Sequence, residues 1–186
     1  VNPKSVLSYL QEGKIVVVAG FQGVTEKGEI TTLGRGGSDT TAAALGVALD
    51  AEEIEIYTDV DGIMTADPQI VQEAKILDTV TYQEICEMAL QGARVIHPRA
   101  VELAMGKGIP VRVKSTFNET NGTLIVADSG KTKIKNGRII TGISYIPNVV
   151  QIRIRININL SEEKSETGLK VFKVLAEHLI SLDLFN

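Results

Sequence analysis

A glycine-rich loop that leads directly into an alanine-rich stretch constrains the fold of this chain more than any other feature. The loop reads Gly34-Arg35-Gly36-Gly37-Ser38-Asp39, and the small side chains of residues 40–49 have strong helix propensity. Apolar runs at residues 15–19 and 54–58 lie on either side, and such runs are typical of buried strands in a parallel sheet. Strand, helix and strand in this order predict a right-handed βαβ unit and therefore an α/β fold.

The same loop has the residues of an anion site. A loop that brings bare backbone N–H groups to a helix N-terminus binds carboxylates and phosphates, and the Arg35 guanidinium could add two parallel hydrogen bonds. The alternative is an ordinary strand–helix connection in which Asp39 or Thr40 caps the helix, because short glycine motifs often match by accident. Arg35 favours the anion site, since a simple turn has no use for a guanidinium.

The remaining patterns predict two domains joined by a polar linker. In residues 1–127 we expect helices at 2–13, 81–92 and 97–108, a hairpin at 24–33, and strands at 110–114 and 123–126. Residues 128–140 are polar and form the expected linker. In residues 141–186, a period-two strand at 150–160, a helix at 169–179 and a strand at 180–185 predict a small α+β module.

Composition limits the possible partners and the compartment. A net charge of -4 leaves no basic surplus for nucleic acid, and no apolar run approaches the ~20 residues that span a bilayer. Cys86 is the only cysteine, so an internal disulfide cannot form and we expect a cytoplasmic protein. The chain begins with Val1 and ends inside an apolar stretch, which leads us to expect a piece of a longer protein.

Polar residues after the predicted strands could take part in chemistry, and each has a structural alternative. Thr58, Asp59, Asp61 and Asp67 could hold Mg²⁺ or sugar hydroxyls, but Asp also favours turns for backbone reasons. Lys114 could reach a phosphate or remain solvated. No Ser/His/Asp order, CxxC pair or HExxH motif supports a hydrolase or a zinc protein.

Three further residues have mainly structural interpretations. His97 precedes a proline at a predicted helix start, so we expect it to cap that helix. His178 is expected at the surface of a helix, and Cys86 in the core.

Four motifs in a fixed order resemble the aspartate kinase family. They are the glycine loop at 34–42, Tyr57-Thr58-Asp59-Val60-Asp61-Gly62-Ile63-Met64-Thr65-Ala66-Asp67-Pro68, Gly92-Ala93-Arg94-Val95-Ile96-His97-Pro98 and Pro110-Val111-Arg112-Val113-Lys114-Ser115-Thr116-Phe117. The resemblance covers residues 1–145 as the second half of an amino-acid-kinase domain. Residues from Thr141 onward resemble the start of an ACT regulatory module. The resemblance thus implies a three-layer α/β fold, with a mostly parallel sheet between helices, followed by a partial ferredoxin-like α+β module.

The resemblance also implies an activity. Aspartate kinases are phosphotransferases with a carboxyl acceptor: they move the γ-phosphoryl group of ATP, bound with Mg²⁺, to the side chain of L-aspartate. The product, 4-phospho-L-aspartate, opens the route to lysine, threonine and methionine. Such transfer depends on positioning and charge stabilisation more than on covalent help. The ACT module implies feedback by lysine, threonine or both, and a homodimer or larger homo-oligomer.

The resemblance assigns roles to twelve residues of this sequence and no protein ligand to a metal. Arg35 would clamp a carboxylate of aspartate, Ser38 and the amides of Gly36 and Gly37 would hold the rest of the substrate, and Phe21 would line its pocket. Asp39 would orient the catalytic lysine and help to cap the helix. The nucleotide would be bordered by Thr58, Asp59, Met64, Asp67 and Pro68, and its base or phosphates would be touched by Lys114.

Several departures from the family pattern limit this assignment. The Lys-Phe-Gly-Gly opening with its phosphate-binding lysine is absent from these residues, as is the acidic partner for the substrate amine. Met64 stands where tyrosine is common, and Gln69 where arginine is usual. We therefore expect the isolated residues to be inactive. The alternatives are another kinase of this fold, acting on glutamate derivatives, carbamate or UMP, and a non-catalytic amino-acid sensor.

Overall fold

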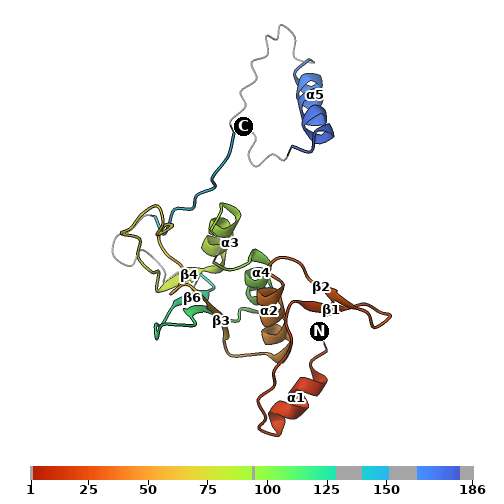
Figure 1. Cartoon of the computed structure of the whole chain (residues 1–186), viewed down its shortest axis with the longest axis vertical. Coiled ribbons are helices and arrows are strands. Elements are labelled where there is room, and N and C mark those ends of the chain that lie inside the picture. Colours follow the sequence, from red (N-terminus) through yellow and green to blue (C-terminus); the bar gives the residue numbers. More distant parts are fainter. Residues whose placement is uncertain (1, 94, 129–139, 151–162, 181–186) are drawn as a thin grey trace. The chain divides into compact units, whose positions relative to one another are not determined.

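The computed structural model describes residues 2–93, 95–128, 140–150 and 163–180. The chain divides into two compact units, Val1–Pro147 and Asn148–Asn186, which are described separately (Figure 1). The larger unit contains a mixed sheet with helices, and the smaller one contains the helix α5 (Glu163–Glu177). The predicted α/β class is confirmed for the larger unit.

The sheet of the larger unit has four strands in the order β3-β5-β6-β4. Their bounds are β3 (Ile54–Thr58), β5 (Val111–Ser115), β6 (Thr123–Val126) and β4 (Thr79–Thr81). β3 pairs with β5 and β4 with β6 in parallel, whereas β5 and β6 are antiparallel, so the sheet is mostly parallel. The strands expected at 54–58, 110–114 and 123–126 are confirmed, and β4 is an addition that the sequence analysis missed.

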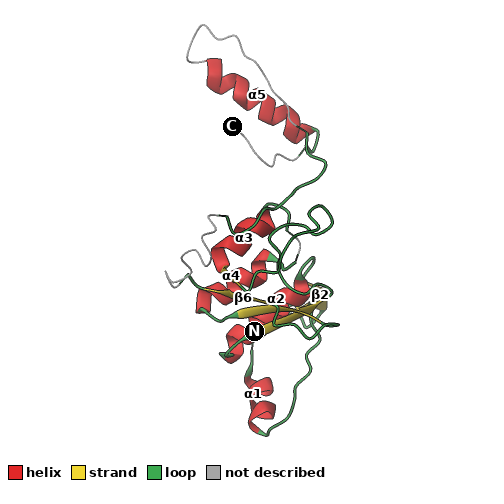
Figure 2. Cartoon of the chain, turned by 90° about the vertical axis from the view of Figure 1, so that its left-hand side faces the viewer, coloured by secondary structure: helices red, strands yellow, loops and turns green. Residues whose placement is uncertain are grey.

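Alternation along the strands separates a buried face from a polar one. Every second residue of β3, β5 and β6 is buried, including Ile56, Val113 and Ile125. Three helices cover this buried face: α2 (Gly37–Leu49), α3 (Tyr82–Leu90) and α4 (Pro98–Lys107) (Figure 2). The close approach of α2 requires a glycine, because a Cβ on Gly46 would lie 2.4 Å from the Ile54 side chain.

The helix starts that the sequence predicted from local signals are confirmed for α3 and α4. Thr81 Oγ1 accepts the Glu84 N–H at 3.2 Å and Glu84 Oε2 accepts the Thr81 N–H at 2.8 Å, which is a complete capping box. In α4, His97 is the N-cap, Pro98 follows at the first helical position, and the helix ends at Gly108 with φ 69°.

The expected cap of the α2 helix is wrong. The helix begins at Gly37, three residues before Thr40, and its N-cap is Gly36 with φ 73° and no side-chain cap. Thr40 Oγ1 donates to the Gly36 carbonyl oxygen at 2.8 Å, and the Asp39 carboxylate accepts a hydrogen bond from His97 instead. Gly36 makes the earlier start possible, because a residue without Cβ adopts the left-handed region without strain.

The buried strand expected at residues 15–19 is also wrong. These residues form no strand, and Ile15 and Val17 are 94% and 92% exposed. A β-branched run becomes a strand only where a neighbour takes its backbone hydrogen bonds, and none of the described strands lies beside this run. The first βαβ unit therefore does not form. The helix α1 (Lys4–Gln11) and the hairpin of β1 (Gln22–Val24) and β2 (Ile30–Thr32) are confirmed.

The smaller unit tests only one element of the expected module. The helix predicted at 169–179 is confirmed by α5, which begins earlier, at Glu163. The strands predicted at 150–160 and 180–185 lie almost wholly outside the described residues, as does most of the linker at 128–140. None of the described helices is long and apolar enough to cross a membrane.

Candidate functional site

The glycine loop and Phe21 come together at the start of α2. A Cβ on Gly37 would lie 2.7 Å from Phe21 Cδ2 and 3.0 Å from Leu33 Cβ, so the loop and the hairpin meet closely there. Phe21 has φ 67° and is held by two hydrogen bonds: its N–H donates to Thr41 Oγ1 at 3.1 Å, and its carbonyl oxygen accepts the Leu33 N–H at 3.0 Å. The structure thus places Phe21 beside the predicted substrate loop.

The loop leaves several donors exposed at the helix N-terminus. Arg35 is exposed and makes no hydrogen bond or ion pair with any described residue. The Gly37 N–H is engaged, since it donates to the Gly34 carbonyl oxygen at 3.0 Å. The amides of Ser38 and Asp39, in the first helical turn, have no acceptor within the described parts of the chain. A guanidinium and free amides side by side can bind a carboxylate or a phosphate.

His97, at the start of α4, lies against this loop. The Asp39 Oδ2 atom accepts the His97 N–H at 3.2 Å, and Asp39 Oδ1 lies 3.5 Å from Ser38 Oγ. A Cβ on Gly36 would lie 2.2 Å from two ring carbons of His97. The expected capping role of His97 is confirmed, because its Nδ1 accepts the Arg99 N–H at 3.3 Å. The contact with the loop is a site feature that the sequence analysis missed.

The three aspartates that the sequence singled out after β3 all accept hydrogen bonds. Thr58 Oγ1 donates to Asp59 Oδ1 at 3.1 Å, and Asp67 Oδ1 accepts the Gln69 N–H at 2.8 Å. Asp61 Oδ1 accepts from Asn118 Nδ2 at 2.7 Å. The Asp67 bond is local and fits the turn-forming alternative, whereas the Asp61 bond joins two loops 57 positions apart in the chain. In the part of the chain that the structure describes, no three His, Cys, Asp or Glu side chains gather as a metal site.

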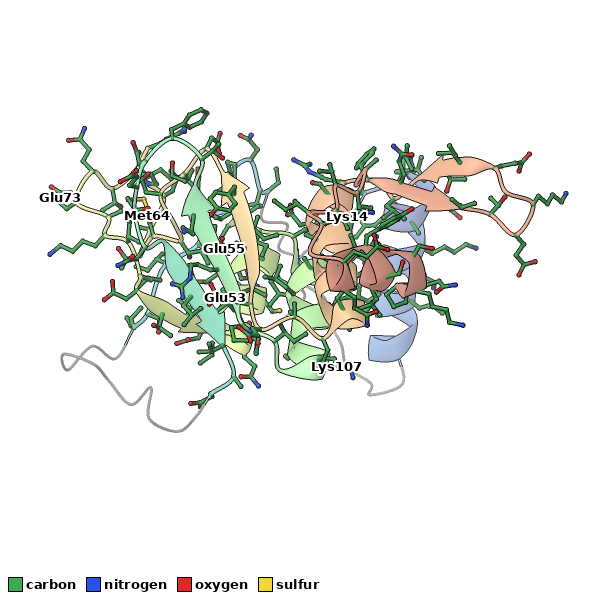
Figure 3. All side chains as sticks on the ribbon, turned by 90° about the horizontal axis from the view of Figure 1, so that it is seen from below. Lys14, Glu53, Glu55, Met64, Glu73 and Lys107 are labelled. Carbon is green, nitrogen blue, oxygen red and sulfur yellow. The ribbon has the colours of Figure 1, made fainter. Side chains whose placement is uncertain are left out.

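Met64 and Pro68 lie in the long loop between β3 and β4. Met64 is half-buried and forms an isolated antiparallel bridge with Ile76, whereas Asp67 and Pro68 are exposed. Figure 3 shows Met64 and Glu73 on this loop, beside the sheet. Their predicted contact with a nucleotide stays a prediction.

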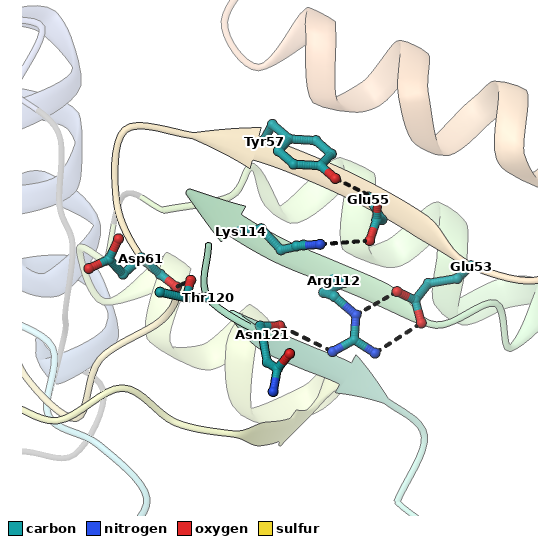
Figure 4. Close-up of polar contacts among 8 residues, drawn as sticks. All are labelled: Glu53, Glu55, Tyr57, Asp61, Arg112, Lys114, Thr120 and Asn121. Atoms are coloured by element: carbon teal, nitrogen blue, oxygen red, sulfur yellow. Dashed lines mark hydrogen bonds and ion pairs between the residues drawn. The ribbon is translucent and has the colours of Figure 1, made fainter. Parts of the chain in front are cut away.

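Lys114 belongs to a polar network on the exposed face of β3 and β5 (Figure 4). Its Nζ lies 3.3 Å from Glu55 Oε1 and 5.4 Å from the centre of the Tyr57 ring, and the Tyr57 hydroxyl donates to Glu55 Oε2 at 2.8 Å. The hydrogen bond with Glu55 raises the pKa of Lys114. The hydrogen bond from Tyr57, with help from Lys114, lowers the pKa of Glu55 against a smaller effect of burial. Lys114 is therefore a held cation at the end of β5.

A second ion pair extends the same face toward the start of β3. Arg112 Nε and Nη2 donate to Glu53 Oε1 and Oε2 at 2.6 and 3.1 Å, and Arg112 Nη1 donates to the Asn121 carbonyl oxygen at 3.2 Å. This fork raises the pKa of Arg112. Together the two pairs balance the charge of the face, with Lys114 near the carboxyl end of β5 and the Glu53–Arg112 pair near the amino ends of both strands.

Glu84 connects α3 to residues that follow the predicted linker. Its Oε1 accepts from Thr141 Oγ1 at 2.6 Å, while Oε2 completes the capping box with Thr81. Nearby, the Ile143 N–H donates to the Thr65 carbonyl oxygen at 2.8 Å, so the chain beyond 140 is tied to the loop that carries Met64. Burial raises the pKa of Glu84, but the hydrogen bonds from Thr141 and Thr81 outweigh it and the net pKa is lowered.

Replacing Glu84 by glutamine is expected to destabilise the chain in a pH-dependent way. A lowered carboxyl pKa gives stability that is present above the ordinary pKa of 4.5 and lost as the pH falls through the folded-state value. The loss for Glu84→Gln should be about 1–2 kcal/mol at pH 7 and should shrink toward pH 3. Urea unfolding at pH 7, 5, 4 and 3 measures it. Glu87→Gln, one turn later on α3 at an exposed position, is the control and should change stability at pH 7 by no more than about 0.5 kcal/mol.

Comparison with known proteins gives a consistent result. The model of the amino acid kinase family matches residues 1–115. Aspartokinase 1 of Bacillus subtilis is 50% identical over 188 residues, which cover 100% of this chain and 45% of that protein. Aspartokinase III of E. coli in complex with aspartate and ADP gives a TM-score of 0.70 at 34% identity, over 99% of this chain and 40% of that one. The same enzyme in complex with lysine and aspartate gives a TM-score of 0.59 at 41% identity, over 72% of this chain and 29% of that one. The chain thus spans less than half the length of these relatives.

Proposed function

The chain belongs to the amino acid kinase family, and we propose that it forms part of an aspartate kinase. The reaction is transfer of the γ-phosphoryl group of ATP to the side-chain carboxylate of L-aspartate, which yields 4-phospho-L-aspartate for lysine, threonine and methionine synthesis in the cytoplasm. The curated relatives that match 99–100% of the chain at 42–50% identity are aspartokinases. The structural relative that matches 99% of it was solved with aspartate and ADP.

The unpaired guanidinium of Arg35 beside the start of α2 is the observation on which this proposal depends. An exposed arginine next to free helix amides suits an amino acid with two carboxylates better than a neutral substrate. Arg35 would hold one carboxylate by a fork of two hydrogen bonds, and Ser38 with the amides of Gly36 and Gly37 would hold the rest of the substrate. The Gly37 N–H donates to Gly34 in this structure, so the amides of Ser38 and Asp39, which have no acceptor among the described residues, could take its place. Phe21, packed on Gly37, would form the wall of the pocket. The proposed role of Asp39 in orienting a catalytic lysine remains part of this hypothesis.

The residues after β3 and β5 are proposed to receive the nucleotide. Thr58, Asp59, Met64, Asp67 and Pro68 would border ATP, and Lys114, already held by Glu55, would contact its base or phosphates. Mg²⁺ in phosphoryl transfer is bound mainly by substrate phosphates and water. We therefore expect an ion that arrives on ATP. The ion would neutralise charge on the transferred group.

Regulation is proposed to depend on residues 141–186. We infer that they begin an ACT module that binds lysine, threonine or both, and that the protein is a homodimer or larger homo-oligomer. E. coli aspartokinase III, one of the structural relatives, was solved with lysine bound. Thr141 and Ile143, the first residues of this region, lie within the larger unit and are bonded to α3 and to the Met64 loop.

A coupled assay of ADP release tests the proposed activity. The complete gene product that carries this sequence should release ADP in the presence of ATP, Mg²⁺ and L-aspartate, and much less with UMP, carbamate or glutamate derivatives. The isolated 186 residues should show no turnover, because they lack the lysine that neutralises phosphate charge in the family. Aspartate-dependent turnover by the isolated residues would refute the second expectation, and turnover restricted to another acceptor would refute the first.

A thermal-shift measurement separates the kinase from the sensor alternative. A ligand that binds the folded state raises the melting temperature by an amount that grows with the logarithm of its concentration relative to Kd. A shift with ATP supports a functional nucleotide site. A shift with lysine alone, together with no ADP release, would instead support a non-catalytic amino-acid sensor.

A further inference from the structure

His97 makes two separate contacts with the substrate loop. Its ring lies directly over Gly36, where a Cβ would stand 2.2 Å from both Cγ and Cδ2 of the imidazole. Gly36 has φ 73°, the left-handed conformation that starts α2 and orients the amides after it. The His97 backbone N–H donates to Asp39 Oδ2 at 3.2 Å, and Asp39 lies next to Ser38. The N-cap residue of α4 therefore contacts the loop on both sides of Gly37.

The ring of His97 has two functions that can be separated by mutation. Its face packs on Gly36, and its Nδ1 accepts the Arg99 N–H, which caps α4. The imidazole is partly buried, and Pro98 fixes the backbone that follows it. A cap alone would need only a short polar acceptor such as Asn or Asp. A ring at this position serves the contact with Gly36.

We propose that His97 is a positioning residue of the kinase site, a role that rests on the proposed function. Its ring fixes Gly36 and its N–H fixes Asp39, so the Arg35 guanidinium and the loop amides keep the geometry that would bind one substrate molecule. His97 itself does not touch the substrate. Binding groups must be held close to their productive geometry by the packing behind them, because small displacements cost much of the rate. The start of α4 provides this packing for the substrate loop.

Three variants of His97 in the complete gene product separate positioning from capping. His97→Phe keeps a ring over Gly36 and loses the acceptor for Arg99, whereas His97→Asn keeps an acceptor and loses the ring. His97→Ala loses both. We expect His97→Asn and His97→Ala to raise the KM for aspartate on the order of ten-fold, with the KM for ATP unchanged. His97→Phe should keep the wild-type KM for aspartate. The melting temperature should fall in His97→Phe and His97→Ala and stay near wild type in His97→Asn.

The kinetic and thermal measurements are predicted to rank the variants differently, and this makes the proposal testable. If the KM for aspartate follows the melting temperature, with His97→Phe impaired and His97→Asn normal, His97 is only a helix cap and the inference is wrong. Unchanged aspartate KM values in all three variants would also overturn it. Absence of aspartate-dependent turnover in the wild-type protein would instead refute the proposed function.

Discussion

Arg35→Ala in the complete gene product is expected to lower kcat/KM for aspartate. The loss of transition-state stabilisation should be about 2–4 kcal/mol, as when one partner of a desolvated charge pair is removed. This corresponds to a loss of about 30-fold to several hundred-fold. The guanidinium is exposed and has no hydrogen bond or ion pair with any described residue, so its removal breaks none of these. Initial rates measured against aspartate at saturating ATP give the effect. Stability should change by no more than about 0.5 kcal/mol, as for other exposed positions.

Two comparison variants define what Arg35 contributes. Arg35→Lys keeps the charge but not the planar fork, so its loss should be intermediate. Lys27→Ala removes a positive charge from the hairpin turn that precedes the loop and should leave aspartate kinetics unchanged. An Arg35→Ala protein with wild-type aspartate kinetics would remove the basis of the proposed clamp. A change confined to the KM for ATP would move the proposed contact from aspartate to a phosphate.

The sequence predicted best those features whose partners are close in the chain. Thr81 and Glu84 exchange hydrogen bonds across three residues, and His97-Pro98 caps its own helix, so α3 and α4 begin where expected. The alternation within β5 and β6 likewise needs no distant information, because buried and exposed residues follow the pleat. Local rules are enough where local atoms satisfy the backbone.

Strands that depend on distant partners were predicted poorly. β4 has only three residues, and it is a strand because Val80 pairs with Ile125, 45 positions further on. Residues 15–19 have the stronger β propensity, yet the described part of the structure offers them no neighbouring strand. Pairing, not the apolar pattern itself, decides whether such a run becomes a strand.

The site shows the same division between local and distant information. The glycine loop could be read from its composition, but the contact between Gly36 and His97 joins positions 61 residues apart. The pairing of Lys114 with Glu55 was also missed, although the alternation of β3 and β5 contains a signal for it. Glu55 and Tyr57 share a face with Arg112 and Lys114 once the strands pair in the observed register. Charges on one face of neighbouring strands are expected to pair.

Gly122→Ala is expected to destabilise the 186-residue chain by about 2–5 kcal/mol. Gly122 comes directly before β6 with φ 62°, and a left-handed conformation costs a residue with Cβ about 1–2 kcal/mol. A Cβ there would also lie 2.0 Å from the Val113 carbonyl oxygen and 2.9 Å from Lys114 Cγ. That oxygen belongs to the backbone of β5 and cannot rotate away, so the strands must shift, at a typical overpacking cost of 1–3 kcal/mol. Urea unfolding followed by circular dichroism measures the loss.

Gly108→Ala is the matched control for this prediction, because Gly108 has φ 69° and nothing within 4 Å of the added Cβ. Gly108→Ala has the cost of the left-handed conformation but no clash of the new Cβ with a neighbour, so its free energy of unfolding should fall by about 1–2 kcal/mol. The difference between the two variants then isolates the close approach of Gly122 to β5. Equal losses in both variants would show that conformation alone requires glycine at position 122. A larger loss in Gly122→Ala means that the β5–β6 connection, and with it the backbone beneath Lys114, tolerates no added methyl group.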